Sequence, residues 1–564
     1  MDDAPGAKIA PRPPGQVMKL ARLGSFHQSR LSFMRQLLRR LKAEEWRFEK
    51  RVFDIDSSGV GHAVYVAHGP SHSYSLVAFA HDLPPEHRSD RVIATAWDAT
   101  FTLFDGIPDA ADIARLAENV PRQEAGRITD RELSLSRANR SVRLWDHVVD
   151  RLAAGKQPNA QKIAEVGYLM RTTAVYGSGK FGAADRECLA DRPECRGPFQ
   201  VEMLSVYLTR AFVLDLVEHM ARMRAPGRAM TLDPNLRRRF GIGNSTGLGM
   251  APFLVNHPAL LHNWIAAREQ ALARVRALPA ASEAEMRALR HATRRARLQA
   301  RIWHSDHPVQ RRRLDELRAD LDRLLAHLET TDLTAPQPWN RLWLWAEAAL
   351  TAEGQEQLVS LLMEPYGALI DDLADTMSAD EQAGWAIDGA MTPAALCRIL
   401  EEVYGWALDI DWTAPAAQAR VWYVSEEKLE PRLGERADAP LADYEYPLCP
   451  GRDAALLHAD LREAPHDTLA DFLLDHPEHR HIVRRAQIAA RLPYAEIRDN
   501  TIDASMLPID MLRMKLSFFG ACHFDPRSDR WVRINMFQNA PFPEDLSRGP
   551  ADDWTLPPLS TGAL

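Results

Sequence analysis

The chain has 564 residues, of which 46% are hydrophobic and 26% are charged, and its formal net charge is −8. These values are typical of a globular protein with roughly two to four domains or one large helical body, and the negative charge gives no overall field that attracts nucleic acid. No apolar run reaches the roughly 18 residues that cross a bilayer, the amino terminus lacks the order of a signal peptide, and the five cysteines are scattered, so we expect a cytoplasmic protein with no membrane partner.

The amino-terminal part is predicted to contain a tail, a helix and a small sheet. Residues 1–18 are rich in proline and glycine, which is typical of a disordered tail. Residues 25–51 place leucines on one side and arginines on the other, which predicts one amphipathic helix. Residues 52–106 contain β-branched and aromatic runs separated by glycine-containing turns, which favours roughly three or four antiparallel strands.

Four histidines lie within this predicted sheet: His62, His68, His72 and His81. Their density raises the hypothesis of a metal site. However, no carboxylate or cysteine accompanies them at a spacing typical of metal ligands, and two of them flank a turn. We therefore predict no metal site and interpret them as surface or core histidines, with a metal site as the alternative.

Residues 134–147 are predicted to form a helix with three arginines at intervals of three residues. Side chains at that spacing share one face of a helix, and Arg137, Arg140 and Arg143 have Asn139 but no acidic residue between them. The face is therefore a candidate anion pocket, and an exposed basic stripe is the alternative. We include the first two of these arginines among the predicted substrate-binding residues.

Residues 168–182 concentrate more chemically specialised side chains than any other stretch of the chain. Arg171 can hold a carboxylate or phosphate through two parallel hydrogen bonds. Gly177, Ser178 and Gly179 then allow a turn whose N–H groups point at one anion, with the hydroxyl as an additional donor. The stretch predicts an anion-binding turn, and a helix end followed by a tight turn is the alternative.

A nucleotide interpretation of the same glycines is less well supported. Residues 177–182 match G-x-G-x-x-G, and Glu202 follows at about the distance expected of the ribose-binding acid. The two prolines within residues 191–198 interrupt the helix that this fingerprint requires. The sequence also does not match the phosphate-binding loop of nucleoside triphosphatases, because Phe181 occupies the position where that pattern requires a serine or threonine.

Residues 199–224 predict a central core helix, because apolar residues occupy nearly all of its sides. Its charged residues Glu202 and Arg210 must find partners or line a pocket if they are buried. Residues 240–258 mix glycines with polar residues before an apolar run, which is typical of a loop that leads to an anion-binding helix end. A glycine-rich connection between core helices is the alternative. The polar residues of this loop are Asn244, Ser245 and Thr246.

The remaining chain is predicted to be mainly helical, with strands near the carboxyl terminus. Residues 258–331 favour two long arginine-rich helices, broken near residue 305, that could mediate a homo-oligomer or bind a protein or RNA partner. Without interleaved aromatic residues this is no strong nucleic-acid signal. A helix is expected at 392–404, and strands are expected at 419–425 and 530–537.

Together these elements predict an α+β fold that is predominantly α-helical. A large helical body would accompany a small antiparallel sheet, formed by the amino-terminal strands and joined by the carboxyl-terminal ones. The predicted organisation is a disordered tail at 1–18, a helix with strands at 19–106, a helical body at 107–410, and an α+β region at 411–564.

The predicted function is that of an enzyme that acts on a small carboxylate or phosphate substrate by acid/base chemistry. Lys180 and Tyr176 are the acid/base candidates, because burial can bring a lysine pKa toward neutrality, and His257 is expected near the same pocket. The sequence requires no cofactor. The alternative is a non-catalytic scaffold that binds its partner through the arginine-rich helices.

Overall fold

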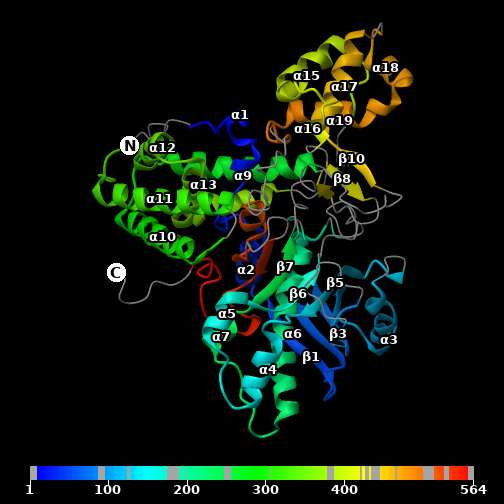
Figure 1. The fold of residues 1–564 in the computed structure, drawn as a ribbon, viewed down its shortest axis with the longest axis vertical. Helices are drawn as coiled ribbons and strands as arrows, with labels where there is room; N and C mark the ends of the chain where they lie inside the picture. The colour runs from blue at the N-terminus through cyan, green and yellow to red at the C-terminus, as the bar shows by residue number, and fades with distance from the viewer. Residues whose placement is uncertain are drawn as a thin grey trace. The chain divides into compact units, whose positions relative to one another are not determined.

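A computed structural model describes residues 9–84, 86, 96–123, 127–173, 189, 191–195, 197, 199–246, 255, 257–305, 308–377, 386–418, 422–425, 431–433, 445–463, 466–498, 513–525 and 532–556 (Figure 1). The chain divides into two units that interleave along the sequence. The helical unit comprises Met1–Ser25, Gly247–Arg290 and Pro308–Met514, and the sheet unit comprises Phe26–Thr246, His291–His307 and Lys515–Leu564.

The sheet unit is built around a mixed sheet, in which the described residues form nine strands in the order β1-β2-β3-β4-β5-β6-β7-β12-β11. Neighbouring strands are antiparallel, except that β6 and β7 are parallel. The strands are β1 Arg47–Ile55, β2 Gly61–His68, β3 Ser73–Ala80, β4 Ala99–Asp105, β5 Glu132–Arg140, β6 Tyr168–Thr173, β7 Gly241–Thr246, β11 His523–Asp525 and β12 Val532–Met536.

Helix α6, Gln200–Arg224, packs on one face of this sheet. It is buried nearly all round, as its continuous apolar sequence predicts. The Phe212 ring lies 5.6 Å from the Phe101 ring of β4 and 6.3 Å from the Tyr65 ring of β2. Because alternate residues of a strand share a face, these contacts identify which residues of each strand point toward α6.

The opposite face of the sheet has an apolar half. There, side chains of β2, β3, β4 and β5 form a core cluster with Leu116 of α3, Ala110–Asn119, and Val120 of the short helix η3, Val120–Arg122, which we call the α3 cluster. The remaining α-helices of the sheet unit are α2 Phe33–Ala43, α4 Trp145–Ala153, α5 Ala160–Val166 and α7 Pro234–Arg238.

The helical unit contains most of the long helices and a small sheet of three strands in the described residues, ordered β10-β8-β9. Helix α10, Glu283–Ile302, begins in this unit and continues in the sheet unit. The other elements are α1 Pro14–Val17, α9 Pro258–Arg276, α11 Pro308–Thr330, α12 Pro338–Ala349, α13 Ala352–Leu362, α14 Gly367–Ile370, α15 Pro393–Leu408, α16 Pro415–Gln418, α17 Pro450–Glu463, α18 Leu469–Asp475, α19 Arg480–Arg491, β8 Trp422–Ser425, β9 Pro431–Leu433 and β10 Glu445–Leu448.

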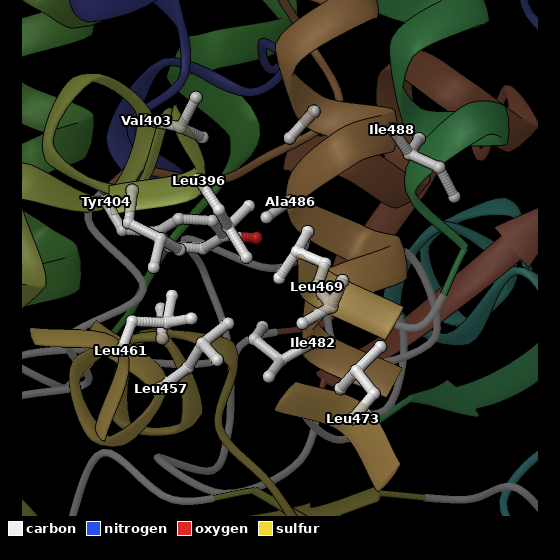
Figure 2. Packing of buried hydrophobic residues seen from close by; sticks show 14 of the residues in the cluster. Leu396, Val403, Tyr404, Leu457, Leu461, Leu469, Leu473, Ile482, Ala486 and Ile488 are labelled. Atoms are coloured by element: carbon white, nitrogen blue, oxygen red, sulfur yellow. The ribbon is translucent and has the colours of Figure 1, made fainter. Parts of the chain in front are cut away.

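Helices α15, α17, α18 and α19 share one apolar core (Figure 2). Leucines and isoleucines from all four helices meet around Tyr404, whose ring is fully buried. The Tyr404 hydroxyl donates a 2.9 Å hydrogen bond to Glu496, and Arg485 Nε lies 2.7 Å from the same carboxylate. The one polar atom of that ring therefore has a charged partner, as a buried hydroxyl requires.

A second buried network joins distant segments of the helical unit. Arg12 donates to both oxygens of Glu269 at 2.7 Å, and to Glu356 at 2.8 and 3.2 Å. Arg12, Glu269 and Glu356 are all at least 97% buried, and the guanidinium also lies 5.1 Å from the Trp343 ring. Within the predicted tail, residues 1–8 lie outside the described part, whereas Arg12 is held by these carboxylates.

The predicted fold class was wrong about the sheet. Instead of a small antiparallel sheet of terminal strands, the chain forms a mixed sheet whose strands β5, β6 and β7 come from the region predicted to be a helical body. Residues 134–140 belong to a strand, not a helix, and the alternation of leucine and serine over residues 133–136 has the period of two that is typical of a strand. Residues 241–246 likewise form a strand, β7, and not a loop.

The amino-terminal helix was also predicted too long. It ends at Ala43, and residues 47–55 form the first strand of the sheet. Other expectations are confirmed: the core helix is α6, the helix near 392–404 is α15, and a break near residue 305 separates α10 from α11. The expectation of two long helices over 258–331 was wrong, because α9 ends at Arg276 and α10 begins at Glu283. Among the described residues, no helix combines the length and hydropathy needed to cross a membrane.

Candidate anion-binding face of the sheet

Strands β5, β6 and β7 bring several of the predicted site residues to neighbouring positions (Figure 1). Asn139 of β5 lies opposite Arg171 of β6, and Arg171 lies opposite Gly243 of β7. Arg137 is two residues before Asn139 on β5 and pairs with Thr173. Residues directly opposite each other, and residues two apart on one strand, share a face. We call the surface that carries Arg137, Asn139 and Arg171 the arginine face.

The arginine face continues the side of the sheet that carries the α3 cluster, but its character changes from apolar to polar. Leu135 of β5 belongs to the α3 cluster, whereas Arg137 and Asn139 follow on the same side of the strand. Asn139 is 5% exposed and Arg171 is 4% exposed. Burial of polar side chains is costly unless they are hydrogen bonded, and the Asn139 amide accepts from the backbone N–H of Asp98 at 2.9 Å and donates to the carbonyl of Ala96 at 3.2 Å. This half of the face therefore differs from the apolar half by its buried polar side chains.

Arg137 is flanked by an indole and a hydroxyl group. Its guanidinium lies 4.1 Å from the centre of the Trp97 ring. Thr100, which pairs with Arg137 across β4 and β5, has its hydroxyl oxygen 3.1 Å from His81 Nε2. Burial lowers the pKa of His81, although the nearby charge of Asp98 opposes the shift. The imidazole is therefore favoured in its neutral form, which can accept a proton.

Arg140 faces the other side of β5. Its backbone N–H donates to Asp98 Oδ2 at 2.9 Å, its Nε lies 3.5 Å from Asp98 Oδ1, and its guanidinium lies 4.9 Å from the Trp145 ring. The prediction that Arg137 and Arg140 share a face was therefore wrong. Side chains three apart share a helix face but point to opposite sides of a strand.

Asn244 and Glu202 are associated with the α6 side of the sheet. Asn244 Nδ2 lies 3.4 Å from Thr172 Oγ1, and both residues are on the face opposite Arg171. Glu202 is in the first turn of α6 and is fully buried. These two residues therefore lie in the same unit as the arginine face but do not line it.

The structure does not describe the side chains of seven predicted site residues. Five of them lie outside the described residues, and two are described only by their backbone in β7, directly after Asn244. His257 is 9% exposed, precedes the first residue of α9 and belongs to the helical unit. The five outside the described residues are Tyr176, Gly177, Ser178, Gly179 and Lys180, and the two described by backbone are Ser245 and Thr246.

The amino-terminal histidines have separate partners. His68 Nδ1 lies 3.1 Å from Ser73 Oγ, and His72 Nδ1 lies 2.9 Å from Glu194. The His62 ring is tilted against the Phe79 ring, with the ring centres 6.4 Å apart, and His81 contacts Thr100. Within the part of the chain that the structure describes, no group of three histidine, cysteine or acidic side chains is arranged to hold a metal ion.

The arginines of α10 and α11 make several contacts within the chain. In the helical unit, Arg290 donates to the carbonyl of Leu328 at 3.0 Å, and Arg313 donates to Glu353 at 3.0 Å. In the sheet unit, Arg295 donates to Asp553 at 2.6 Å. These arginines therefore stabilise their own units, a role that the charge pattern alone does not reveal.

Sequence reasoning missed Trp97, Thr100 and Tyr168 as neighbours of the predicted site. Trp97 and Thr100 surround Arg137, and Tyr168 precedes Arg171 on β6. The signal that could have found the first two is the pair of an aromatic residue just before β4 and a polar residue at its start. Comparisons with models of protein families, with curated proteins and with solved structures find no significant match to this chain.

Proposed function

We propose that the sheet unit binds a small carboxylate- or phosphate-bearing molecule at the arginine face, and that the protein is an enzyme that acts on it by acid/base chemistry. The observation that carries this proposal is the buried polar half of the sheet face, on which Arg137, Asn139 and Arg171 lie on adjacent strands. Arginine suits this role because its guanidinium can donate two parallel hydrogen bonds to one carboxylate or phosphate.

The connection from β6 through α6 to β7 also supports the proposed anion site. Because β6 and β7 are parallel neighbours, both end at the same edge of the sheet, with α6 as the crossover helix between them. In open sheets of this kind, ligands commonly bind outside the carboxyl ends of parallel strands. The glycines, Ser178 and Lys180 follow β6 along the sequence, and we propose that they complete the anion site from that edge.

The proposed acid/base groups are Lys180 and Tyr176, with His81 as an added candidate. His81 is close to the arginine face through Thr100, and its lowered pKa favours the neutral imidazole at neutral pH. A general base or acid works best when its pKa lies near the working pH. The acid/base role predicted for His257, which belongs to the helical unit, stays a prediction.

The test combines native mass spectrometry of the purified protein with calorimetric titration of phosphate, pyrophosphate, succinate and citrate at constant ionic strength. We expect at least one anion to bind the wild type. Arg171→Met and Lys180→Ala should each weaken that binding by about tenfold to a hundredfold, the value of a charge-assisted hydrogen bond. Because Arg171 is buried, circular dichroism must show that its variant is folded.

Arg122→Met is the matched control. Arg122 is in the same unit, its side chain is 46% exposed, and it lies 3.8 Å from Glu118 on the same helical segment. This variant should bind the anion as the wild type does. If no anion is retained or bound by the wild type, or if Lys180→Ala and Arg171→Met bind as tightly as the control, the proposed function is wrong.

A further inference from the structure

Tyr168, the first residue of β6, has a buried hydroxyl group whose role the packing of the sheet does not explain. The side chain is 2% exposed. Among the described residues, its Oη atom has no hydrogen-bond partner. Nearly all buried polar atoms of native proteins have a partner, because an unpaired one loses its hydration without compensation. Phenylalanine would fill the same space without that cost.

The register of the sheet places Tyr168 on the arginine face. Tyr168 lies opposite Gly241, and Arg171 lies opposite Gly243, so β6 has one more residue than β7 over this interval. Such a bulge shifts the alternation of side chains by one position. Gly241 and Gly243 are two residues apart and share a face, and their partners Tyr168 and Arg171 therefore share it too.

The aromatic ring confirms this placement, because it lies flat against Gly243. A Cβ atom built on Gly243 would be 2.6 Å from Tyr168 Cγ and 2.7 Å from both Cδ atoms. The glycine therefore provides the space that the ring occupies. On the neighbouring strand β12, Asn535 pairs with Gly243, and its Nδ2 donates to the carbonyl of Val166 at 3.3 Å. Asn535 therefore contacts the segment that leads into Tyr168.

We propose that the Tyr168 hydroxyl donates a hydrogen bond to an oxygen atom of the anion that binds the arginine face. This inference rests on the proposed function and adds an uncharged donor to it. A phenol hydroxyl donates one directional hydrogen bond, and such a bond to an ionised oxygen is about twice as strong as one to a neutral acceptor. Arg171 and Tyr168 together would select an anion with at least two oxygen atoms, a carboxylate or a phosphate, over a halide.

The test compares Tyr168→Phe with the wild type in two measurements. The first is thermal unfolding without added anion, and the second is calorimetric titration of the anion that the panel of phosphate, pyrophosphate, succinate and citrate identifies. Removal of a hydroxyl without a protein partner should leave the melting temperature unchanged or raise it. Loss of the hydrogen bond to the anion should raise Kd by about tenfold to a hundredfold.

Tyr207→Phe is the matched control in the same unit. Tyr207 is fully buried on α6, and its hydroxyl donates to the carbonyl of Pro541 at 3.1 Å. Its loss should lower the melting temperature and leave Kd unchanged, the reverse of the pattern expected at Tyr168. Titration with sodium chloride should show no difference between the wild type and Tyr168→Phe.

The outcomes separate this inference from the function on which it rests. If Tyr168→Phe binds the anion with the wild-type Kd while Arg171→Met does not, the anion site stands and the role of Tyr168 is wrong. If Tyr168→Phe melts at a lower temperature without the anion, the hydroxyl has a structural partner and the inference is also wrong. If the wild type binds no member of the panel, both the function and the inference fail.

Discussion

Arg137 and Arg140 have the same charge and are three residues apart, yet the strand separates their environments. Arg137 lies over the Trp97 ring on the arginine face, whereas Arg140 contacts Asp98 and Trp145 on the opposite face. The period of the backbone decides which charges act together. An arginine pattern therefore predicts a shared site only when the secondary structure is known.

Gly243 gives a test at the scale of one residue. We expect Gly243→Ala to lower the free energy of unfolding by about 1–3 kcal/mol, because the new methyl group would overlap the Tyr168 ring, as in other overpacked cores. Gly405→Ala is the control, since a Cβ atom at Gly405 meets no heavy atom within 4 Å. Urea unfolding followed by circular dichroism measures both. Equal stability of Gly243→Ala and the wild type would show that the ring does not occupy that space.

At the scale of elements, the parallel pair β6 and β7 is the feature that organises the candidate site. A parallel connection needs a crossover, and α6 provides it with a helix that is buried on nearly all sides. The helix also contains Arg210, which donates to the carbonyls of Phe240, Ala540 and Arg238 at 2.7 to 3.1 Å. Carbonyl oxygens thus satisfy a buried charge that the sequence predicted to need a partner.

Arg12 gives a test at the scale of elements, because it joins the amino-terminal segment to α9 and α13. Arg12→Ala should lower the free energy of unfolding by about 3–5 kcal/mol, since it leaves Glu269 and Glu356 buried without their main partner. Arg122→Ala is the exposed comparison and should cost less than about 1 kcal/mol. Thermal and urea unfolding of the full chain measure the difference. A cost for Arg12→Ala as small as that for Arg122→Ala would contradict the ion-pair network.

At the scale of the whole molecule, each unit is assembled from segments far apart in the sequence. Arg12 is 257 residues from Glu269 and 344 residues from Glu356. The two carboxylates therefore find their partner only after the chain has folded. Local sequence carries no information about such pairs, although it can show that a charge stands within an apolar helix.

The acid stability of the whole chain should reflect Glu356. Burial opposes its ionisation, but the charges of Arg12 and Arg268 outweigh burial and lower its pKa to about 2. A carboxyl group with a lowered pKa stabilises the folded state above its unfolded pKa, about 4.3, and loses this contribution as the pH falls toward 2. The melting-temperature difference between the wild type and Glu356→Gln should therefore be largest near pH 7 and narrow below about pH 4. A difference that stays constant from pH 7 to pH 3 would contradict this assignment.

The sequence alone determined the features that depend on local pattern. Continuous apolar residues predicted α6, a composition of β-branched and aromatic residues predicted β2 and β3, and a proline-containing break predicted the end of α10. It also singled out Arg171, whose strand lies in the candidate site. These signals are local because helix and strand periodicity are properties of a few consecutive residues.

Only the tertiary structure decided the size of the sheet, its mixed topology and the residues that share the arginine face. Residues of β5 and β7 were predicted to form a helix and a loop, and those of β6 were left open between a helix and a strand, because polar residues and glycines within these strands obscure the pattern of a buried strand. Tyr168 and Arg171 share a face of the sheet because of a bulge in β6. The Tyr168 ring contacts Gly243 because β6 pairs with β7 across a long crossover connection. Register between distant strands is set by packing across the whole sheet, and one residue of shift moves a side chain to the other face.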